Sequence, residues 1–332
     1  MKINKQFVLS IALLIFLSIS AKAQENVSQF LNGSLKDANI LGKAYLEPFG
    51  KSLGTSLNSG WFTSAKPHKL GGFDITFTVA TTIPPSSAKT FDVNKLKLDY
   101  WKLQTPTDNI AQTVTGAKET GPTLVPQNPL LPGTMDLPKG AGLKFIPAPI
   151  IQAGIGLPFN TELDFRYLPK IDINQVGSIS LWGFGIKNEF KEFIPGFKAI
   201  PFNLSAFFGY TKLKSSFDIS APQPDASKDQ TLDISTSGYT AKLLISKSIP
   251  VLTVYAGVGY NKSTTDVKLK GEYSIPNYTV SSAKDPISLD FSNSGMNANV
   301  GMRIKLAIIA FNFDYTFGSY KLFNAGVGIN FR

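Results

Sequence analysis

The end of the chain alternates strictly between apolar residues and small or polar ones. One face carries Phe323, Ala325, Val327, Ile329 and Phe331, and the other carries Asn324, Gly326, Gly328 and Asn330. A period of two predicts a β-strand with one apolar face. An outer-membrane β-barrel ends in a strand of this kind, because one face contacts lipid and the other faces the lumen.

The same alternation recurs along most of the chain from residue 71 onward. We expect segments 71–80 and 95–100 to form the first hairpin. Further strand-like segments are 150–156, 160–168, 177–188, 201–213, 238–247, 251–262, 265–274, 285–292, 295–305, 309–317 and 320–331. Tight connections alternate with long polar ones such as 216–236. The sequence therefore predicts an all-β fold, a transmembrane antiparallel β-barrel of about 12–14 strands over residues 71–332.

The start of the chain has the three parts of a secretory signal peptide. Lys2 and Lys5 precede an apolar stretch over residues 7–19, and a small-x-small site ends at Ala23. This pattern predicts a signal peptide over 1–23, cleaved after Ala23, and export to the outer membrane of a Gram-negative bacterium. A retained anchor is disfavoured, because the apolar stretch is short for a membrane-spanning helix.

Residues 26–46 show helical periodicity instead. Their apolar positions are Val27, Phe30, Leu31, Leu35, Ala38, Leu41 and Tyr45, and Pro48 and Gly50 are expected to end the helix. We interpret 24–70 as an N-terminal helical, plug-like segment. It could enter the lumen, cap the periplasmic end or lie along the rim.

Residues 104–149 hold eight of the 21 prolines of the chain. Proline lacks the backbone N–H that a sheet needs, so we expect a long loop, either extracellular or folded into the lumen. A linker between two soluble domains is less consistent with the strands that resume after it.

Composition excludes several classes of site. The chain has no cysteine and a single histidine, His68, so it offers no disulfide, thiolate site or usual transition-metal site. No calcium loop and no His–nucleophile motif is present. We therefore expect no catalytic residue, no metal and no cofactor, and interpret the protein as not an enzyme. The net charge of +10 is spread along the chain, which disfavours nucleic acid as a partner. It is compatible with anionic lipid headgroups, anionic solutes or an ordinary solvated surface.

Two rows of charged residues are predicted to face the lumen. The first row is Glu162, Asp164 and Arg166, and the second is Lys95, Lys97 and Asp99. In the first row, residues two apart share one face of the strand, and Leu163, Phe165 and Tyr167 lie on its other face. A charge on the lipid face is costly, so the charged face is expected to be the lumen face. Each row could set ion selectivity or form a self-neutralising network that holds the barrel.

Aromatic residues gather near the predicted strand ends. They are Trp182, Tyr210, Tyr255, Tyr260, Tyr315 and Tyr320. They could form a girdle at the membrane interface or simply reflect strand propensity.

Several motifs resemble those of a family of Gram-negative outer-membrane barrel proteins of unknown function. The motifs are Gly60-Trp61-Phe62, Ala65 to Asp74, Gln152 to Pro158, Arg166 to Pro169, and Phe193 to Gly196 with Pro201-Phe202. More distantly, the layout is similar to that of the long-chain fatty-acid outer-membrane transporters. That resemblance implies a helical plug inside a barrel and passage of hydrophobic molecules, and no ligand-binding residue carries over.

Two functions remain in view. The first is a passive channel or transporter for small molecules, including hydrophobic ones, with outer-membrane lipid and a small hydrophobic ligand as its partners. The second is a structural or interaction barrel that binds a partner through loops at 104–149, 216–236 and 275–294. A barrel-embedded enzyme and a secreted β-sandwich are weaker alternatives, and the sequence does not determine the oligomeric state.

Overall fold

Ten antiparallel strands close into a barrel in the computed structural model, which describes residues 29–31, 33–173, 176–197, 200–219, 230–274 and 282–331. The barrel strands are β1 (Phe73–Ile83), β7 (Ile146–Leu157), β8 (Thr161–Ile173), β9 (Gly177–Glu189), β10 (Asn203–Asp218), β11 (Thr231–Ser248), β12 (Leu252–Lys270), β15 (Ile287–Leu306), β16 (Ile309–Phe317) and β17 (Lys321–Phe331). Pairing of β1 with β17, from Phe73 opposite Phe331 onward, closes the ring. The signal peptide predicted over 1–23 lies outside the described residues.

The predicted barrel is confirmed, but the expected 12–14 strands are wrong, because the structure closes with ten. Segments 251–262 and 265–274, predicted as two strands, fall largely in the single long strand β12. Segments 285–292 and 295–305 fall in the single long strand β15. In β12 the outward side changes from apolar to polar after Tyr260, and in the sequence this change resembles a turn. Segment 95–100, predicted as a barrel strand, lies outside the barrel.

The two ends of the barrel differ in the length of their connections. The end with both barrel termini, here called the inner end, has connections 158–160, 190–202 with η4 (Lys191–Phe193), 249–251 and 307–308. The opposite, outer end has 84–145, 174–176, 219–230, 271–286 and 318–320. Short turns at one end and longer loops at the other are the asymmetry typical of outer-membrane barrels.

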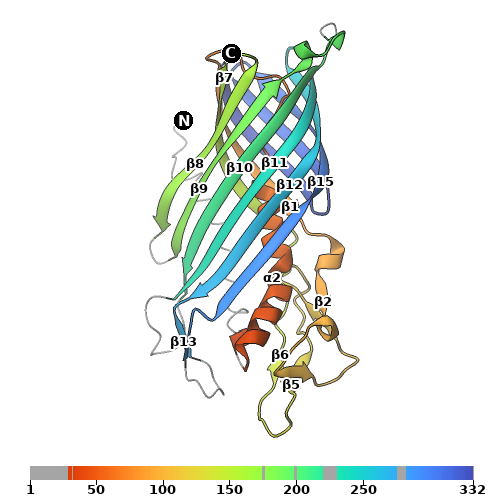
Figure 1. Cartoon of the computed structure of the whole chain (residues 1–332), viewed down its shortest axis with the longest axis vertical. Coiled ribbons are helices and arrows are strands. Elements are labelled where there is room, and N and C mark those ends of the chain that lie inside the picture. The colour runs from red at the N-terminus through yellow and green to blue at the C-terminus, as the bar shows by residue number, and fades with distance from the viewer. Residues whose placement is uncertain are drawn as a thin grey trace.

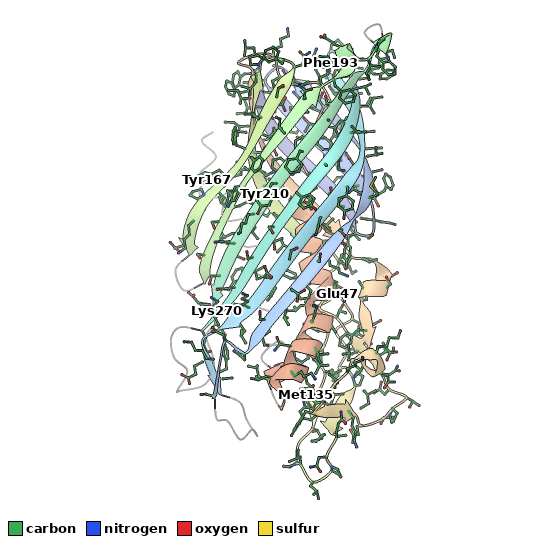
Figure 2. All side chains as sticks on the ribbon, in the orientation of Figure 1. Glu47, Met135, Tyr167, Phe193, Tyr210 and Lys270 are labelled. Carbon is green, nitrogen blue, oxygen red and sulfur yellow. The ribbon has the colours of Figure 1, made fainter. Side chains whose placement is uncertain are left out.

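The outward face is apolar in the inner half of the barrel and polar in the outer half. The boundary is marked by the outward-facing aromatic residues Tyr167, Trp182, Tyr210, Tyr239 and Tyr260. Figure 2 shows Tyr167 and Tyr210 at similar heights on the wall, with Lys270 near the outer rim. Three of the aromatics predicted for a girdle thus lie at this boundary. Tyr255 is instead buried, and Tyr320 is buried in a connection.

Helix α2 (Leu35–Leu57) follows η1 (Gln29–Leu31) and runs from the outer end into the barrel (Figure 1). Ser34 caps its start by accepting a hydrogen bond from the Asp37 backbone N–H. The predicted end at Pro48 and Gly50 is wrong, because the helix continues to Leu57. Packing explains the difference: a Cβ at Gly50 would collide with Phe291 of β15, so glycine lets the helix approach the wall.

Residues 84–145 form a separate module beside the outer half of α2, here called the outer module (Figure 1). It contains η2 (Ser86–Ala88), β2 (Thr90–Asp92), η3 (Val93–Lys95), β3 (Trp101–Leu103), β4 (Ile110–Gln112), β5 (Thr123–Pro126) and β6 (Met135–Asp136). Its strands pair as β2–β4 and β3–β5–β6, and a further hairpin joins β13 (Glu272–Ser274) to β14 (Ser282–Lys284).

The predicted domain of 71–332 is therefore not barrel throughout, and the predicted loop at 104–149 contains short paired strands and the start of β7. In the part of the chain that is described, no helix combines the length and apolar character needed to cross a membrane.

Candidate functional site

The lumen is the region where the polar residues of the barrel converge, and it is occupied. Ten strands spaced about 4.8 Å apart and tilted by about 40° give a barrel of roughly 10 Å radius. A helix with side chains is about 10–12 Å across, so α2 and the inward side chains fill the outer half. Thr265 of β12 donates a hydrogen bond of 2.9 Å to the Gly50 carbonyl, and Ser56 and Thr82 share one of 2.7 Å.

The segment that follows α2, residues 58–70, occupies the inner half of the lumen. Trp61 is 1% exposed and packs against Phe207 of β10, and Ala65 is buried beside them. The Asn58 amide donates to the Lys262 carbonyl at 3.0 Å, and Ser205 donates to the Ala65 carbonyl. The chain thus crosses the lumen from the outer end to the inner end before it enters β1.

Arg166 of β8 holds the C-terminal end of α2. Its guanidinium donates to the carbonyls of Leu57 at 2.8 Å and Ser59 at 2.5 Å, and its carbon lies 3.5 Å from the centroid of the Trp61 ring. These carbonyls have no partner within the helix, and a cation at a helix C-terminus is favoured by the helix dipole. Gln152 accepts a further hydrogen bond from Arg166 Nε at 3.0 Å.

Asp37 holds the other end of α2 to the outer module. Its carboxylate accepts backbone N–H hydrogen bonds from Asp99, Tyr100 and Trp101 at 2.8, 2.9 and 2.9 Å. Tyr45, further along the helix, accepts from the Val114 N–H through its own carbonyl at 3.0 Å. The helix is therefore bound to the barrel wall at one end and to the outer module at the other.

A buried charged cluster surrounds His68 near the inner end. Glu162 of β8 accepts from Lys187 at 2.6 Å and contacts His68 Nδ1 at 2.7 Å, and it also accepts from the His68 backbone N–H. His68 Nε2 lies 2.6 Å from the Asn330 amide nitrogen of β17. The cluster thus links β8, β9 and β17 to the segment that crosses the lumen.

A second buried polar network centres on Asp314 of β16. Asn299 and Asn324 donate to its carboxylate at 2.6 and 3.0 Å, and Lys242 donates to Asn299 at 2.8 Å. Ser59, next to the end of α2, donates to Asn324 at 3.0 Å. This network also joins the crossing segment to the wall.

The two predicted charged rows have different positions. Glu162, Asp164 and Arg166 face the lumen and are buried, and each makes hydrogen bonds inside the barrel. In the described part of the chain no ion pair joins these three side chains to one another, because Glu162 pairs with Lys187 and His68 while Arg166 donates to carbonyls. The choice between the two predicted roles therefore stays a prediction.

Lys95, Lys97 and Asp99, expected in the lumen, instead lie exposed in the outer module. Asp99 pairs with Lys36 at 2.6 Å and thereby raises the pKa of Lys36 above its ordinary value.

The sequence did not indicate that Lys187 and His68 belong to the buried cluster with Glu162, or that Asp37 attaches α2 to the outer module. The alternation of β9 could have placed Lys187 inward, because its neighbours Ile186 and Asn188 fall on the other side of the strand. His68 and Asp37 lie in segments without a strand period, and their partners are distant in sequence. Within the described residues, no group of three or more His, Cys, Asp or Glu side chains is placed to hold a metal ion.

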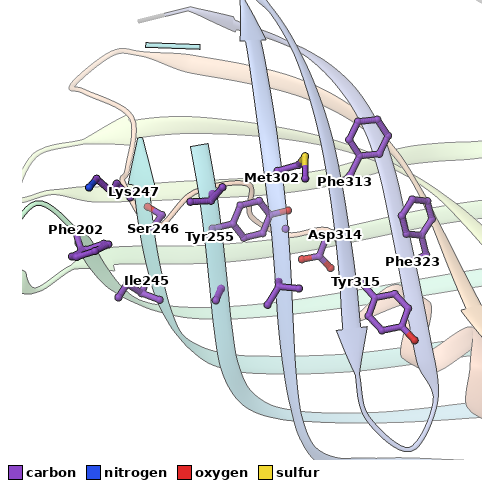
Figure 3. A pocket seen from close by; sticks show the side chains of 14 residues that line it. Phe202, Ile245, Ser246, Lys247, Tyr255, Met302, Phe313, Asp314, Tyr315 and Phe323 are labelled. Atoms are coloured by element: carbon purple, nitrogen blue, oxygen red, sulfur yellow. The ribbon is translucent and has the colours of Figure 1, made fainter. Parts of the chain in front are cut away.

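An apolar groove of about 590 Å³ lies on the lipid-facing side of β11, β12, β15, β16 and β17 (Figure 3). Val254, Met302, Phe313 and Phe323 are among the side chains that line it, and Lys247 stands at its edge. Polar residues also contribute to its lining, namely Ser246, Tyr255 and Asp314.

Together these features define a membrane β-barrel whose lumen is closed by its own N-terminal helix and the segment after it. The chain belongs to a family of unknown function, DUF6588, whose model matches residues 1–331. Among curated proteins, none matches the sequence significantly.

Three solved structures show some similarity to this chain at low sequence identity. The attachment invasion locus protein Ail of Yersinia pestis, in complex with the heparin analogue sucrose octasulfate, shares 8% identity, with 79% of this chain and 98% of that chain covered and a TM-score of 0.28. The translocator domain of the autotransporter NalP from Neisseria meningitidis shares 11%, covering 80% and 89%, with a TM-score of 0.30. A Pseudomonas aeruginosa FadL homologue shares 9%, covering 79% and 90%, with a TM-score of 0.27. Likeness at this level carries no conclusion about function.

Proposed function

We propose that this protein is a closed barrel of the Gram-negative outer membrane that presents the outer module at the cell surface. The observation that carries the proposal is the attachment of α2 at both ends, by Arg166 to the wall and by Asp37 to the outer module. A helix fixed in this way serves as a stalk for the module rather than as a freely leaving plug.

The alternative of a passive channel for small molecules needs a continuous path through the lumen. Helix α2 occupies the outer half and residues 58–70 the inner half, with buried hydrogen bonds to both. Opening such a path would break several buried polar contacts at once, each of which costs about 1–3 kcal/mol when left unpaired. The interaction barrel therefore fits the geometry better than the channel.

The tip of the outer module offers a surface for a partner. Leu130 is 88% exposed, and Leu131 beside it is also exposed, between Pro129 and Pro132. Adjacent exposed leucines at a loop tip gain free energy when a partner covers them. The flanking prolines reduce the conformational entropy that binding would remove.

Cysteine labelling on intact cells tests the proposed display, because the natural chain contains no cysteine. Leu130→Cys places a thiol in the loop between β5 and β6 of the outer module. Phe193→Cys places one at the inner end, where Figure 2 labels Phe193. Both native side chains are exposed, at 88% and 78%, so they form a matched pair. A membrane-impermeant maleimide should label Leu130→Cys on intact cells and Phe193→Cys only after the outer membrane is permeabilised. The reverse pattern would refute the proposed orientation.

A further inference from the structure

A group of lysines lies on the outward face of the barrel, between the aromatic boundary and the outer rim. We call it the lysine patch: Lys170 of β8, Lys212 and Lys214 of β10, and Lys268 and Lys270 of β12. These residues line an open depression of about 660 Å³ on the outer half of the wall. It faces away from the lumen, so it is separate from the buried networks of the closed barrel.

The register shows how the patch is built. Ser180 of β9 and Ser235 of β11 lie on either side of Lys214, directly opposite it in the two neighbouring strands. Lysine ammonium groups and serine hydroxyls are both hydrogen-bond donors, and together they suit the oxygens of a phosphate group.

The acidic residues in and around the patch do not neutralise it. Asp172 pairs with Lys170 at 2.9 Å, and Asp233 lies 3.7 Å from Lys270 while accepting from Ser216 at 2.6 Å. Asp266 also lines the depression. Asp233 is also directly opposite Lys268 in the register. Five lysines thus face three carboxylates, and within the described residues Lys212, Lys214 and Lys268 form no ion pair, so the patch has an excess of positive charge.

The position of the patch relative to the membrane points to its ligand. Lys212 pairs directly opposite Trp182, and Tyr210 lies two residues nearer the apolar band. Aromatic side chains of this kind sit at the headgroup level of a membrane. The lysines therefore begin where lipid headgroups begin, on the side assigned to the cell exterior. The outer leaflet of a Gram-negative outer membrane is built of phosphorylated glycolipid, whose charge complements the patch.

We propose that the lysine patch binds the phosphate groups of an outer-leaflet glycolipid and so fixes the height of the barrel in the membrane. This inference rests on the proposed location and orientation of the protein. Each lysine near an anionic lipid surface contributes a favourable electrostatic attraction, and the serines add hydrogen bonds.

Binding by the full-length protein in neutral detergent micelles tests the inference. The probes are bisphosphorylated lipid A and the same lipid without its phosphates. The triple variant Lys212→Gln, Lys214→Gln, Lys268→Gln removes the unpaired cations. The matched control changes three exposed lysines of the outer module, Lys97→Gln, Lys118→Gln and Lys144→Gln, and so alters the net charge equally.

The native protein should bind the phosphorylated lipid more tightly than the dephosphorylated one. The patch variant should bind the phosphorylated lipid at least roughly tenfold more weakly, while the control variant keeps native affinity. Equal binding of the two lipids by the native protein, or an equal loss in both variants, would overturn the inference. Phosphatidylglycerol in the same neutral micelles, if bound as tightly as lipid A, would overturn the assignment to a glycolipid.

A second variant guards against loss of folding. Lys214→Glu alters one exposed residue and reverses its charge, and the shifted gel mobility of unheated barrels reports that each variant is folded. It should weaken lipid A binding several-fold, and unchanged binding would count against the patch. Labelling of Leu130→Cys measures the orientation independently of lipid A binding. A failed lysine-patch proposal can therefore be told apart from a failed proposed function.

Discussion

Arg166 is the residue whose removal tests the attachment of α2 most sharply. Arg166→Met keeps an unbranched side chain beside Trp61 and removes the hydrogen bonds to the carbonyls of Leu57 and Ser59. It also removes one of two cations near the buried Asp164, the other being Lys187. Hydrogen bonds from a charged group contribute about 1.5–3 kcal/mol each, and breaking a buried charged arrangement typically costs about 3–5 kcal/mol. We therefore expect a loss of about 3–5 kcal/mol in the free energy of unfolding.

The assay is urea unfolding of the refolded barrel in detergent, combined with hydrogen exchange of residues 53–61. In the variant, exchange in this segment should accelerate more than in the middle of β10 or β11, because the hydrogen bonds that Arg166 donates to α2 end within this segment. Arg303→Met is the matched control, since Arg303 is also an arginine inside the barrel and its hydrogen bond to Thr63 is long, at 3.5 Å. A stability loss below about 1 kcal/mol for Arg166→Met, or equal effects in both variants, would refute the role assigned to Arg166.

Three further predictions concern the closed lumen. Gly54→Ala should lower the thermal midpoint, because its Cβ would collide with Ser263 of β12. Gly42→Ala should raise the midpoint slightly, because its Cβ would lie 3.5 Å from Leu289 of the wall and alanine favours a helix over glycine by about 1 kcal/mol. Asp37→Asn should cost about 1–3 kcal/mol and speed proteolysis of the outer module, and unchanged proteolysis would count against the attachment. Lys187→Met should lower the urea midpoint by the equivalent of about 3 kcal/mol, because Glu162 stays buried with only His68 beside it; the native midpoint would contradict this.

The barrel itself was predictable because a lipid-exposed wall imposes strict alternation on every strand. The strand count was not, because alternation alone does not show where a strand leaves the membrane. In β12 the outward residues change from Tyr260 to Lys262 and Asp266 without any break in pairing with β11. A polar outward face beyond the membrane looks like a turn in the sequence but is the continuation of the same strand.

The candidate lumen residues were predictable only where the strand assignment was right. Glu162, Asp164 and Arg166 lie in a true barrel strand, and steps of two place them on one face. Segment 95–100 alternates in the same way for a different reason: Leu96 and Leu98 pack against the core around α2, while Lys95 and Lys97 face solvent. Apolar residues two positions apart can therefore also occur in an irregular segment that packs on a helix.

The attachment of α2 was beyond sequence reasoning for a further reason. Its contacts join residues far apart in the chain, such as Arg166 with Leu57 and Asp37 with Trp101. Helical spacing in the sequence shows that the segment has an apolar face, and it does not show which surface that face meets. Only the closed wall, with a lumen about as wide as one helix, selects the interior.

Conductance across a planar lipid bilayer tests the central claim most directly, namely that the lumen is closed by α2 and residues 58–70. The native protein, inserted and folded, should show no steady ion conductance. The double variant Asp37→Asn, Arg166→Met should show frequent openings, because the contacts of these two residues at the ends of α2 are weakened or lost. A steady open conductance of the native protein, unchanged in the double variant, would contradict the closed barrel and favour a channel.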